Sequence, residues 1–200
     1  DIRFGAPIDA VRRTASGAEV KSHGADWESF DEVVFATHSD DTLRLLSDAT
    51  AVEHSVLGAV RYQPNKVILH SDTSIMPRRR QVWSSWVYTE DAQRTDTEIN
   101  LTYWMNSLQP WLKGQDMMVT LNSKRPINED LIWDEVSLRH PVYDLEAIAA
   151  QKAATAMNGA NHTWFCGAWM KNGFHEDGLS SGLDVVDALN ASDRMRLAAE

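Results

Sequence analysis

The first fifty residues show a hydrophobic pattern that predicts strands followed by a short helix. Residues 8–13 and 18–22 flank a turn at 15–17, and this arrangement predicts a β-hairpin. Residues 31–37 contain a compact β-branched and aromatic run, typical of a fully buried strand. Helix-capping side chains follow at 39–41, before a short apolar helix. This region therefore has the pattern of the edge of an α/β unit.

The pattern changes after residue 52, where strand candidates follow one another without long helices between them. The segments with strand-like composition are residues 65–70, 81–88, 99–103, 117–121 and 132–140. The turns between them contain Asp72, Pro77, Asp91 and Gly114. A short helix is expected at 104–109, and Pro141 is expected to stop the last strand. Residues 53–140 therefore read as a mostly antiparallel sheet domain inserted into the surrounding unit.

The C-terminal third returns to a helix–strand–helix pattern. Residues 145–157 predict a helix closed by Asn158-Gly159, residues 163–169 a buried strand, and residues 179–189 a second helix. We therefore expect residues 1–52 and 141–200 to form one domain. The fold class predicted for the whole chain is α/β with mixed α+β character.

Composition and charge narrow the classes of function. The formal net charge is −10, which opposes binding to nucleic acid and to anionic lipid surfaces. The single cysteine, Cys166, excludes an intramolecular disulfide and cysteine-rich zinc sites, and its aromatic neighbours indicate a buried structural thiol. No apolar run reaches the ~20 residues of a membrane span, so a cytoplasmic location is expected.

Tryptophan is unusually frequent in the middle of the chain. Five of the eight tryptophans lie there: Trp83, Trp86, Trp104, Trp111 and Trp133. Their flat, amphipathic rings suit a sheet with one ligand-facing side, although core packing alone explains most of them.

The most informative segment runs from Gly167 to Gly182. It predicts a strand, a glycine-containing loop and a helix that begins near Gly178. Unpaired N–H groups and the helix dipole make such a place suitable for a phosphate or an electron-rich ring. By pattern alone, an ordinary crossover between strand and helix remains the simpler interpretation.

The residues of this segment resemble a known flavin-binding signature. The run Trp-Phe-Cys-Gly-Ala-Trp (residues 164–169), followed by Gly-Phe-His-Glu-Asp-Gly-Leu-x-Ser-Gly (residues 173–182), is similar to the C-terminal signature of a bacterial family of NAD/FAD-binding proteins. That family belongs to the flavin-containing amine oxidase and protoporphyrinogen oxidase superfamily. Further segments match it in order: residues 30–38, 62–65, 69–72, 76–77, 83–86, 103–109, 119–122 and 140–142. The resemblance extends from about Ile8 to Leu189.

The resemblance implies an FAD-binding Rossmann-like domain with an inserted substrate domain of mixed or antiparallel sheet. Residues 1–52 and 141–200 would belong to the first and residues 53–140 to the second. Ile8 would meet the adenine, while Ala36 and Thr37 would pass the adenosine-diphosphate half. The segment beside the pyrophosphate, ribityl chain and flavin would contain Gly167, Ala168, Glu176, Asp177, Gly178 and Leu179.

Two features depart from the family pattern. Ala168 stands where many relatives carry an acidic residue that binds the ribityl hydroxyls. The first fifty residues also contain no Gly-x-Gly-x-x-Gly loop, which binds the pyrophosphate in this family. We therefore expect the chain to be a fragment or a truncated gene product that does not bind FAD alone.

The resemblance implies an FAD-dependent oxidoreductase acting on an apolar or amine small molecule. The alternative is a cofactor-free binding or interaction module derived from such an enzyme. No catalytic triad and no metal site is expected, and no catalytic residue is assigned. Among the histidines, His38 is a candidate for a functional role beside the cofactor, and His70 with Asp72 is expected to form a hydrogen-bonded structural pair.

Overall fold

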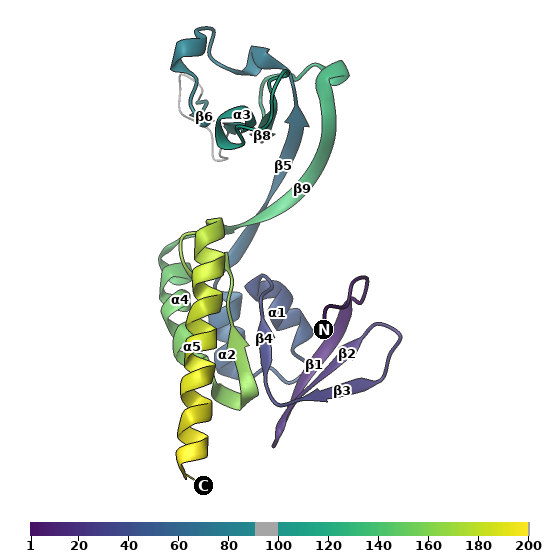
Figure 1. The fold of residues 1–200 in the computed structure, drawn as a ribbon, viewed down its shortest axis with the longest axis vertical. Helices are drawn as coiled ribbons and strands as arrows, with labels where there is room; N and C mark the ends of the chain where they lie inside the picture. Colours follow the sequence, from purple (N-terminus) through teal and green to yellow (C-terminus); the bar gives the residue numbers. More distant parts are fainter. Residues whose placement is uncertain (91–99, 200) are drawn as a thin grey trace. The chain divides into compact units, whose positions relative to one another are not determined.

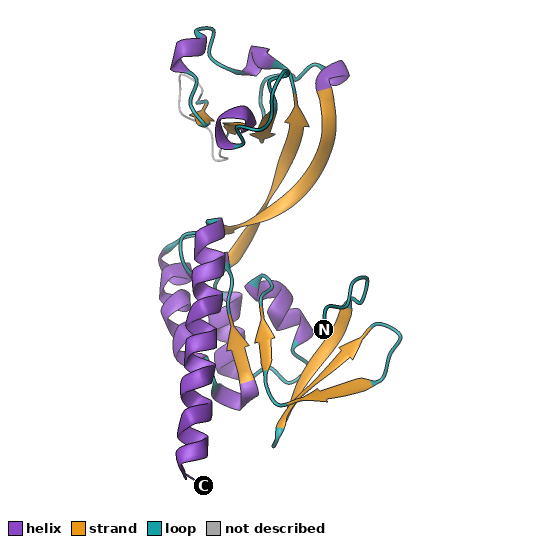
Figure 2. Ribbon diagram, in the orientation of Figure 1, coloured by secondary structure: helices purple, strands orange, loops and turns teal. Residues whose placement is uncertain are grey.

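The computed structural model describes residues 1–90 and 100–199, and these fall into two compact units. Unit 1 comprises Asp1–Tyr62 and Pro141–Glu200, and unit 2 comprises Gln63–His140. Figure 1 shows the chain coloured along its sequence, and Figure 2 shows its helices and strands. The first boundary lies at Tyr62 rather than at residue 52, because one further helix belongs to unit 1. None of the described helices is long and apolar enough to cross a membrane.

Unit 1 opens with a three-stranded antiparallel sheet. It consists of β1 (Ile8–Thr14), β2 (Gly17–Ser22) and β3 (Trp27–Phe30), in that order. The hairpin predicted from the sequence is confirmed, and Gly17 is required in it because a Cβ there would lie 2.2 Å from the carbonyl oxygen of Phe30. β3 is not predicted from the sequence, because its side chains are mostly exposed and carry no apolar alternation.

A second sheet in unit 1 contains two parallel strands that are far apart in sequence. They are β4 (Val33–Phe35) and β10 (Thr163–Phe165), paired residue for residue. The rings of Phe35 and Phe165 stack with their centroids 6.1 Å apart. Both predicted buried strands are therefore confirmed, in shorter form, and they lie in a different sheet from residues 118–121.

Four α-helices pack around these strands. They are α1 (Ser39–Leu45), α2 (Ala51–Gly58), α4 (Leu145–Met157) and α5 (His175–Ala199). The predicted helix 145–157 is confirmed, and Asp144 caps it by accepting from the Ala147 N–H at 2.8 Å. Short 3₁₀ turns, η4 (Ala160–His162) and η5 (Ala168–Met170), flank β10.

One apolar core joins the elements of unit 1. Its buried side chains include Val11, Phe35, Leu57, Ala150, Phe165 and Trp169, from β1, β4, α2, α4, β10 and η5. A second, smaller cluster lies between β10 and α5 and consists of Trp164, Cys166 and Val185. Cys166 is 7% exposed and burial raises its pKa, as expected for a structural thiol.

A buried ion pair ties α2 to the first sheet. The Arg13 guanidinium donates to both carboxylate oxygens of Glu53, at 2.7 and 2.9 Å, and both side chains are almost fully buried. Glu53 also accepts from the N–H of Thr50 at 2.7 Å and completes a capping box at the start of α2. Burial opposes ionisation of Glu53, but the hydrogen bonds from Arg13 and Thr50 outweigh it and lower its pKa.

Unit 2 is built on a five-stranded sheet in the order β6-β7-β8-β5-β9. The strands are β5 (Arg61–His70), β6 (Trp86–Tyr88), β7 (Leu101–Trp104), β8 (Met118–Leu121) and β9 (Ile132–Val142). The remaining elements are α3 (Met105–Leu108) and the 3₁₀ turns η1 (Thr73–Ile75), η2 (Arg80–Val82) and η3 (Glu129–Leu131).

The structure refines the strands predicted for this unit. β6 begins only at Trp86, and β9 continues through Pro141 instead of stopping there. Ile99, the first residue of one predicted strand, and Asp91, assigned to a turn, lie outside the described residues. The pairs β5–β8, β6–β7 and β7–β8 are antiparallel, as expected.

His70 and Asp72 form a hydrogen-bonded pair, as expected from the sequence, but the bond comes from the Asp72 backbone and belongs to a larger polar network. The backbone N–H of Asp72 donates to Nδ1 of His70 at 3.2 Å, so the proton of the neutral ring is on Nε2, which donates to Thr120 at 2.7 Å. The Thr120 hydroxyl bonds in turn to that of Thr102 at 2.9 Å. Burial lowers the pKa of His70. This histidine is therefore neutral and structural, and its side chain does not bond to the Asp72 carboxylate.

Two of the central tryptophans, Trp83 and Trp104, make cation–π contacts with Arg80. The Arg80 guanidinium lies 4.6 Å from the Trp83 ring centroid and 5.2 Å from that of Trp104. Asp116 pairs with Arg80 at 2.6 Å and accepts from the indole N–H of Trp104 at 3.1 Å. These two tryptophans therefore have a structural role.

Candidate functional site

The parallel pairing of β4 and β10 brings four predicted site residues to one place. Because parallel strands end at the same edge of a sheet, Ala36 and Thr37 after β4 lie beside Gly167 and Ala168 after β10. The indole N–H of Trp169 donates to the carbonyl of Thr37 at 3.2 Å and fixes the two strand ends together. We call Ala36, Thr37, Gly167 and Ala168 the carboxyl edge.

Gly167 occupies a conformation that other residues rarely adopt. Its φ is +140°, and an added Cβ would lie 2.9 Å from Cδ1 of Trp169. Its N–H donates to the Ser181 hydroxyl at 2.8 Å, and that hydroxyl donates to the carbonyl of Gly178 at 2.8 Å. The end of β10 is therefore joined directly to the first turns of α5.

The start of α5 differs from the sequence prediction. The helix begins at His175, not near Gly178, and the N–H of Gly178 donates to the carbonyl of Phe174 at 3.2 Å. The first-turn N–H groups without an intrahelical acceptor thus belong to residues 175–177. Asp177 accepts from the Phe174 N–H at 3.0 Å, which supports a capping role for this carboxylate.

Gly178 faces the carboxyl edge, although it does not require a glycine for space. A Cβ at Gly178 would lie 3.8 Å from the backbone nitrogen of Ala168 and 3.9 Å from its Cβ, which is ordinary contact. Glu176 is exposed, and Leu179 is exposed on the neighbouring turn. Of the residues predicted in this helix, Gly178 therefore lies beside Ala168, whereas Glu176 and Leu179 face solvent.

Ile8 lies in a different part of unit 1 from the carboxyl edge. It is the first residue of β1 and lines a surface pocket of about 650 Å³ together with Val20, Phe30, Val33 and Val34. The pocket thus joins the start of β1 to β4, the strand that leads to Ala36 and Thr37. Its contact with adenine stays a prediction.

Two tyrosines beside the edge were not identified from the sequence as site residues. The hydroxyl of Tyr143 donates to the carbonyl of Ala168 at 3.4 Å, and burial, with Tyr62 and Asp177 nearby, raises its pKa to about 12. Tyr62 accepts from the N–H of Ser39 at 2.8 Å, and burial raises its pKa as well. Both phenols are therefore neutral hydrogen-bonding groups at neutral pH.

Tyr143 is also the reason that a glycine is required in the loop between β10 and α5. Gly173 has a φ of +92°, and an added Cβ would lie 2.7 Å from the Tyr143 hydroxyl. The N–H of Gly173 donates to the carbonyl of Ala168 at 3.1 Å. No sequence motif marks Tyr143, because its contacts are with residues about 25 positions later in the chain.

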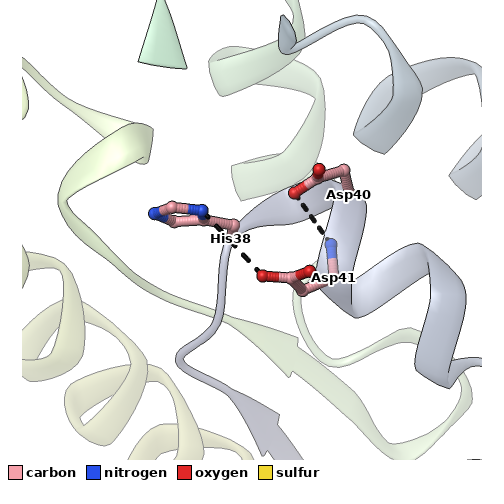
Figure 3. A group of neighbouring side chains, drawn as sticks. All are labelled: His38, Asp40 and Asp41. Atoms are coloured by element: carbon pink, nitrogen blue, oxygen red, sulfur yellow. Dashed lines mark hydrogen bonds and ion pairs between the residues drawn. The ribbon is translucent and has the colours of Figure 1, made fainter. Parts of the chain in front are cut away.

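His38 follows the carboxyl edge and belongs to a small cluster with Asp40 and Asp41, shown in Figure 3. Within the described part of the chain this is the one group of three or more His, Cys, Asp or Glu residues whose ligand atoms all lie within 4.8 Å of one another. Asp40 accepts from the N–H of Asp41 at 2.9 Å, and Asp41 pairs with Arg44 at 2.8 Å. The bond to the Asp41 N–H and the ion pair with Arg44 thus give each carboxylate a partner within α1. The ring of His38 stacks on Tyr62 with centroids 4.3 Å apart.

No protein-family model matches the chain, and no curated protein sequence matches it either. Solved structures do match. A CLA-producing fatty acid isomerase from P. acnes has a TM-score of 0.62 at 14% identity, over 92% of this chain and 47% of its own. Wild-type putrescine oxidase bound to putrescine has a TM-score of 0.57 at 12% identity, over 94% of this chain and 48% of its own.

A third match is a reduced UDP-galactopyranose mutase, with a TM-score of 0.55 at 13% identity, over 85% of this chain and 42% of its own. The chain therefore spans about half the length of these proteins. At such identities the likeness shows the fold. It confirms the predicted mixed α/β fold class and agrees with the resemblance found in the sequence.

Proposed function

We propose that this chain supplies the C-terminal half of an FAD-dependent oxidoreductase of the amine oxidase type. The observation that carries the proposal is the convergence of Ala36, Thr37, Gly167 and Ala168 with the first turn of α5 at one edge of a parallel sheet. Ligands of open α/β sheets bind outside the carboxyl ends of the strands. The oxidases among the structural neighbours support the reaction class.

The residues at this edge fit an extended, anionic dinucleotide. Ala36 and Thr37 are exposed, and Gly167 and Ala168 are half-buried, so backbone and small side chains of this edge are accessible to a ligand. The N–H groups of residues 175–177 and the positive end of the α5 dipole favour a negative or electron-rich group beside them. Bound FAD would supply the hydride or electron transfer.

The described residues of this edge perform binding and positioning in the proposal. Tyr143 donates a hydrogen bond to the Ala168 carbonyl, and Trp169 donates one to the Thr37 carbonyl. These bonds fix the ends of β4 and β10 relative to each other. The neutral phenols of Tyr62 and Tyr143 add no negative charge at neutral pH that would oppose an anionic cofactor. We assign no proton transfer to either.

We propose that unit 2 holds an apolar or amine substrate. Trp86 and Tyr103 form a T-shaped pair with centroids 6.1 Å apart, and Tyr88 on the same strand as Trp86 is 65% exposed. Aromatic rings bind apolar groups by burial and ammonium groups by cation–π attraction. Putrescine, found in one structural neighbour, is an amine of this kind.

The 200-residue chain alone is expected to be colourless when purified. It has no Gly-x-Gly-x-x-Gly loop, so half of the cofactor would lack its main phosphate contacts. Titration with free FAD, followed by flavin fluorescence, should show no saturable binding at micromolar concentrations. A yellow protein, or saturable quenching, would show that these residues hold FAD without that loop.

The substrate class is tested with the protein encoded by the natural reading frame that contains this chain, purified with FAD. Anaerobic mixing with putrescine or with an unsaturated fatty acid should bleach the flavin absorbance for the substrate that is oxidised. Trp86→Ala should slow the bleaching by about tenfold or more if its ring binds the substrate, whereas Trp83→Ala serves as a control for a structural tryptophan. Equal rates in the parent and in Trp86→Ala would remove this residue from the substrate site.

A further inference from the structure

Strand β9 forms one edge of the five-stranded sheet of unit 2 and is exposed along most of its length. Across residues 1–90 and 100–199, its only neighbouring strand is β5, and Figure 1 shows the two lying side by side. All residues from 133 to 140 are exposed, among them Trp133, Val136 and Leu138 at 60%, 45% and 47%. A long edge strand with exposed apolar side chains is a template for pairing with a further strand.

Part of this edge receives little support from the rest of the sheet. The N–H of Ser71 donates to the carbonyl of Leu131, and the side-chain amide of Asn65 donates to the ring of His140, both at 2.9 Å, so β5 and β9 run antiparallel. β8 pairs only with residues 67–70 of β5. In the described chain, the earlier part of β5 therefore forms a two-stranded ribbon with β9. Such a ribbon is marginally stable in water, and a further strand beside β9 would stabilise it.

The charged residues of β9 are arranged symmetrically about Ser137. Glu135 lies two residues before it and Arg139 two residues after it, while Asp134 lies three before and His140 three after. When two copies of β9 pair in antiparallel orientation with Ser137 at the centre, each acidic side chain lies opposite a basic or imidazole side chain of the other copy. Opposite charges directly across an antiparallel pair stabilise it, and like charges destabilise it.

Other registers do not match these charges. Side chains alternate between the two faces of a sheet, so two identical antiparallel strands keep their faces aligned only when the pairing is centred on a residue. Centring on Val136 or Leu138 leaves both charged neighbours of Ser137 opposite uncharged residues, and centring on Glu135 or Arg139 places like charges opposite each other. The register centred on Ser137 also sets Val136 opposite Leu138 of the second copy.

We propose that β9 pairs with β9 of a second copy of this chain, in antiparallel orientation and centred on Ser137, and thereby joins two five-stranded sheets into one. Two-fold symmetry repeats each contact, so the pair formed by Glu135 and Arg139 of the second copy occurs twice. Within one chain Glu135 already pairs with Lys66 at 2.9 Å, so its carboxylate would lie between two cations. This inference does not depend on the proposed function.

The charges favour a second copy over an unrelated strand. The formal net charge of −10 opposes association between copies in general, so self-pairing needs local complementarity. An unrelated strand would have to present the charges of β9 in reverse order, and β9 itself does so when it runs antiparallel. One paired strand on each side makes a small interface, so we expect a dissociation constant on the order of 10 μM.

Sedimentation equilibrium of the 200-residue chain from about 1 to 200 μM tests this association. The apparent mass should rise from that of one chain towards that of two. Arg139→Glu and Glu135→Arg each place like charges opposite each other at both symmetry-related positions, so each should weaken association by about tenfold or more. A parent chain that stays monomeric at about 200 μM, or single variants that associate as the parent does, would overturn the proposal.

An equimolar mixture of Arg139→Glu and Glu135→Arg distinguishes strand pairing from a general effect of charge. Each variant supplies the charges that the other lacks, so the mixture should associate about as tightly as the parent although neither variant does so alone. Arg78→Glu is the matched control, because it changes the net charge as Arg139→Glu does, at an exposed position outside β9. A mixture that does not associate, or an equal loss of association in Arg78→Glu, would count against the proposal.

Cysteine cross-linking tests the register. Ser137→Cys places two thiols directly opposite each other, where Cα atoms of antiparallel partners are about 4.5–5.5 Å apart and a disulfide can form. In Asp134→Cys the two thiols would be six residues apart along the paired strands, roughly 20 Å, which is too far. The native Cys166 is buried. Under mild oxidation Ser137→Cys should therefore form covalent dimers about tenfold faster or more, and equal rates in the two variants would show that the register is wrong.

The protein encoded by the natural reading frame that contains this chain decides between a second copy and another segment of the same polypeptide. It should associate over the same range of concentrations and lose that association on Arg139→Glu. A longer protein that stays monomeric would show that another segment covers β9, and would overturn the proposal. FAD titration of the same protein reports on the proposed function alone, so the failure of one proposal is distinguishable from the failure of the other.

Discussion

Gly167→Ala should destabilise the chain by about 2–4 kcal/mol. The backbone of Gly167 has a φ of +140°, which costs other residues conformational energy, and the added Cβ would lie 2.9 Å from Cδ1 of Trp169. Trp169 is 3% exposed, so its ring has little room to move without breaking the indole bond to the Thr37 carbonyl. Urea unfolding followed by tryptophan fluorescence would measure the change.

Gly182→Ala is the matched control for that experiment. Gly182 lies inside α5, and nothing lies within 4 Å of an added Cβ. Alanine is favoured over glycine inside a helix, so this change should stabilise the chain by about 0.5–1 kcal/mol. If both substitutions had the same small effect, the close approach of Trp169 to Gly167 would be wrong, and with it the geometry of the carboxyl edge.

Glu53→Gln should lower the free energy of unfolding by about 3 kcal/mol, at the lower end of the range for breaking a buried ion pair. Arg13 and Glu53 have side chains only 6% and 7% exposed, so the substitution leaves a buried guanidinium without its main partner. Asp48 still pairs with Arg13 at 2.9 Å, which limits the loss. The free energy of unfolding at neutral pH, compared with that of the parent, tests the prediction.

This effect should depend on pH in a defined direction. The pKa of Glu53 is lowered in the folded state, so its contribution is fully present above its unfolded pKa of about 4.3. It is lost as the pH falls through the folded-state pKa, and the parent and the Glu53→Gln variant should then converge in stability. Glu19→Gln removes the partner of Arg12, whose side chain is 47% exposed, and should lower the free energy of unfolding by less than about 1 kcal/mol at any pH. A constant difference between parent and Glu53→Gln down to acid pH would contradict the assignment.

The sequence predicted the elements whose residues carry a strong local signal. The buried strands β4 and β10 have dense apolar runs, and α4 has both a capping aspartate and a closing glycine. β3 has four residues of which three are exposed, so no alternation marks it. α2 is not predicted from the sequence, because its first turn contains the capping box rather than an apolar stripe. Most of its residues were therefore included in the predicted inserted domain, which was placed at residues 53–140.

The site was predictable only where its residues are consecutive. Gly167 and Ala168 were found through the resemblance, and their position beside Ala36 and Thr37 follows from parallel pairing. The start of α5 was placed three residues late, because the glycine Gly178 suggested a boundary although the helix already begins at His175. Tyr143 makes its contacts across the fold, and no pattern of neighbouring residues reports such contacts.

The proposal that the carboxyl edge holds FAD is tested most directly by one affinity measurement. In the natural reading frame that contains this chain, Ala36→Leu places a larger side chain at an exposed position of the edge. Ala25→Leu does the same in an exposed turn away from it. We predict that the parent and Ala25→Leu bind FAD equally, whereas Ala36→Leu binds it about tenfold or more weakly without loss of thermal stability. Equal FAD affinity for all three proteins, or a parent that binds no FAD, would contradict the account.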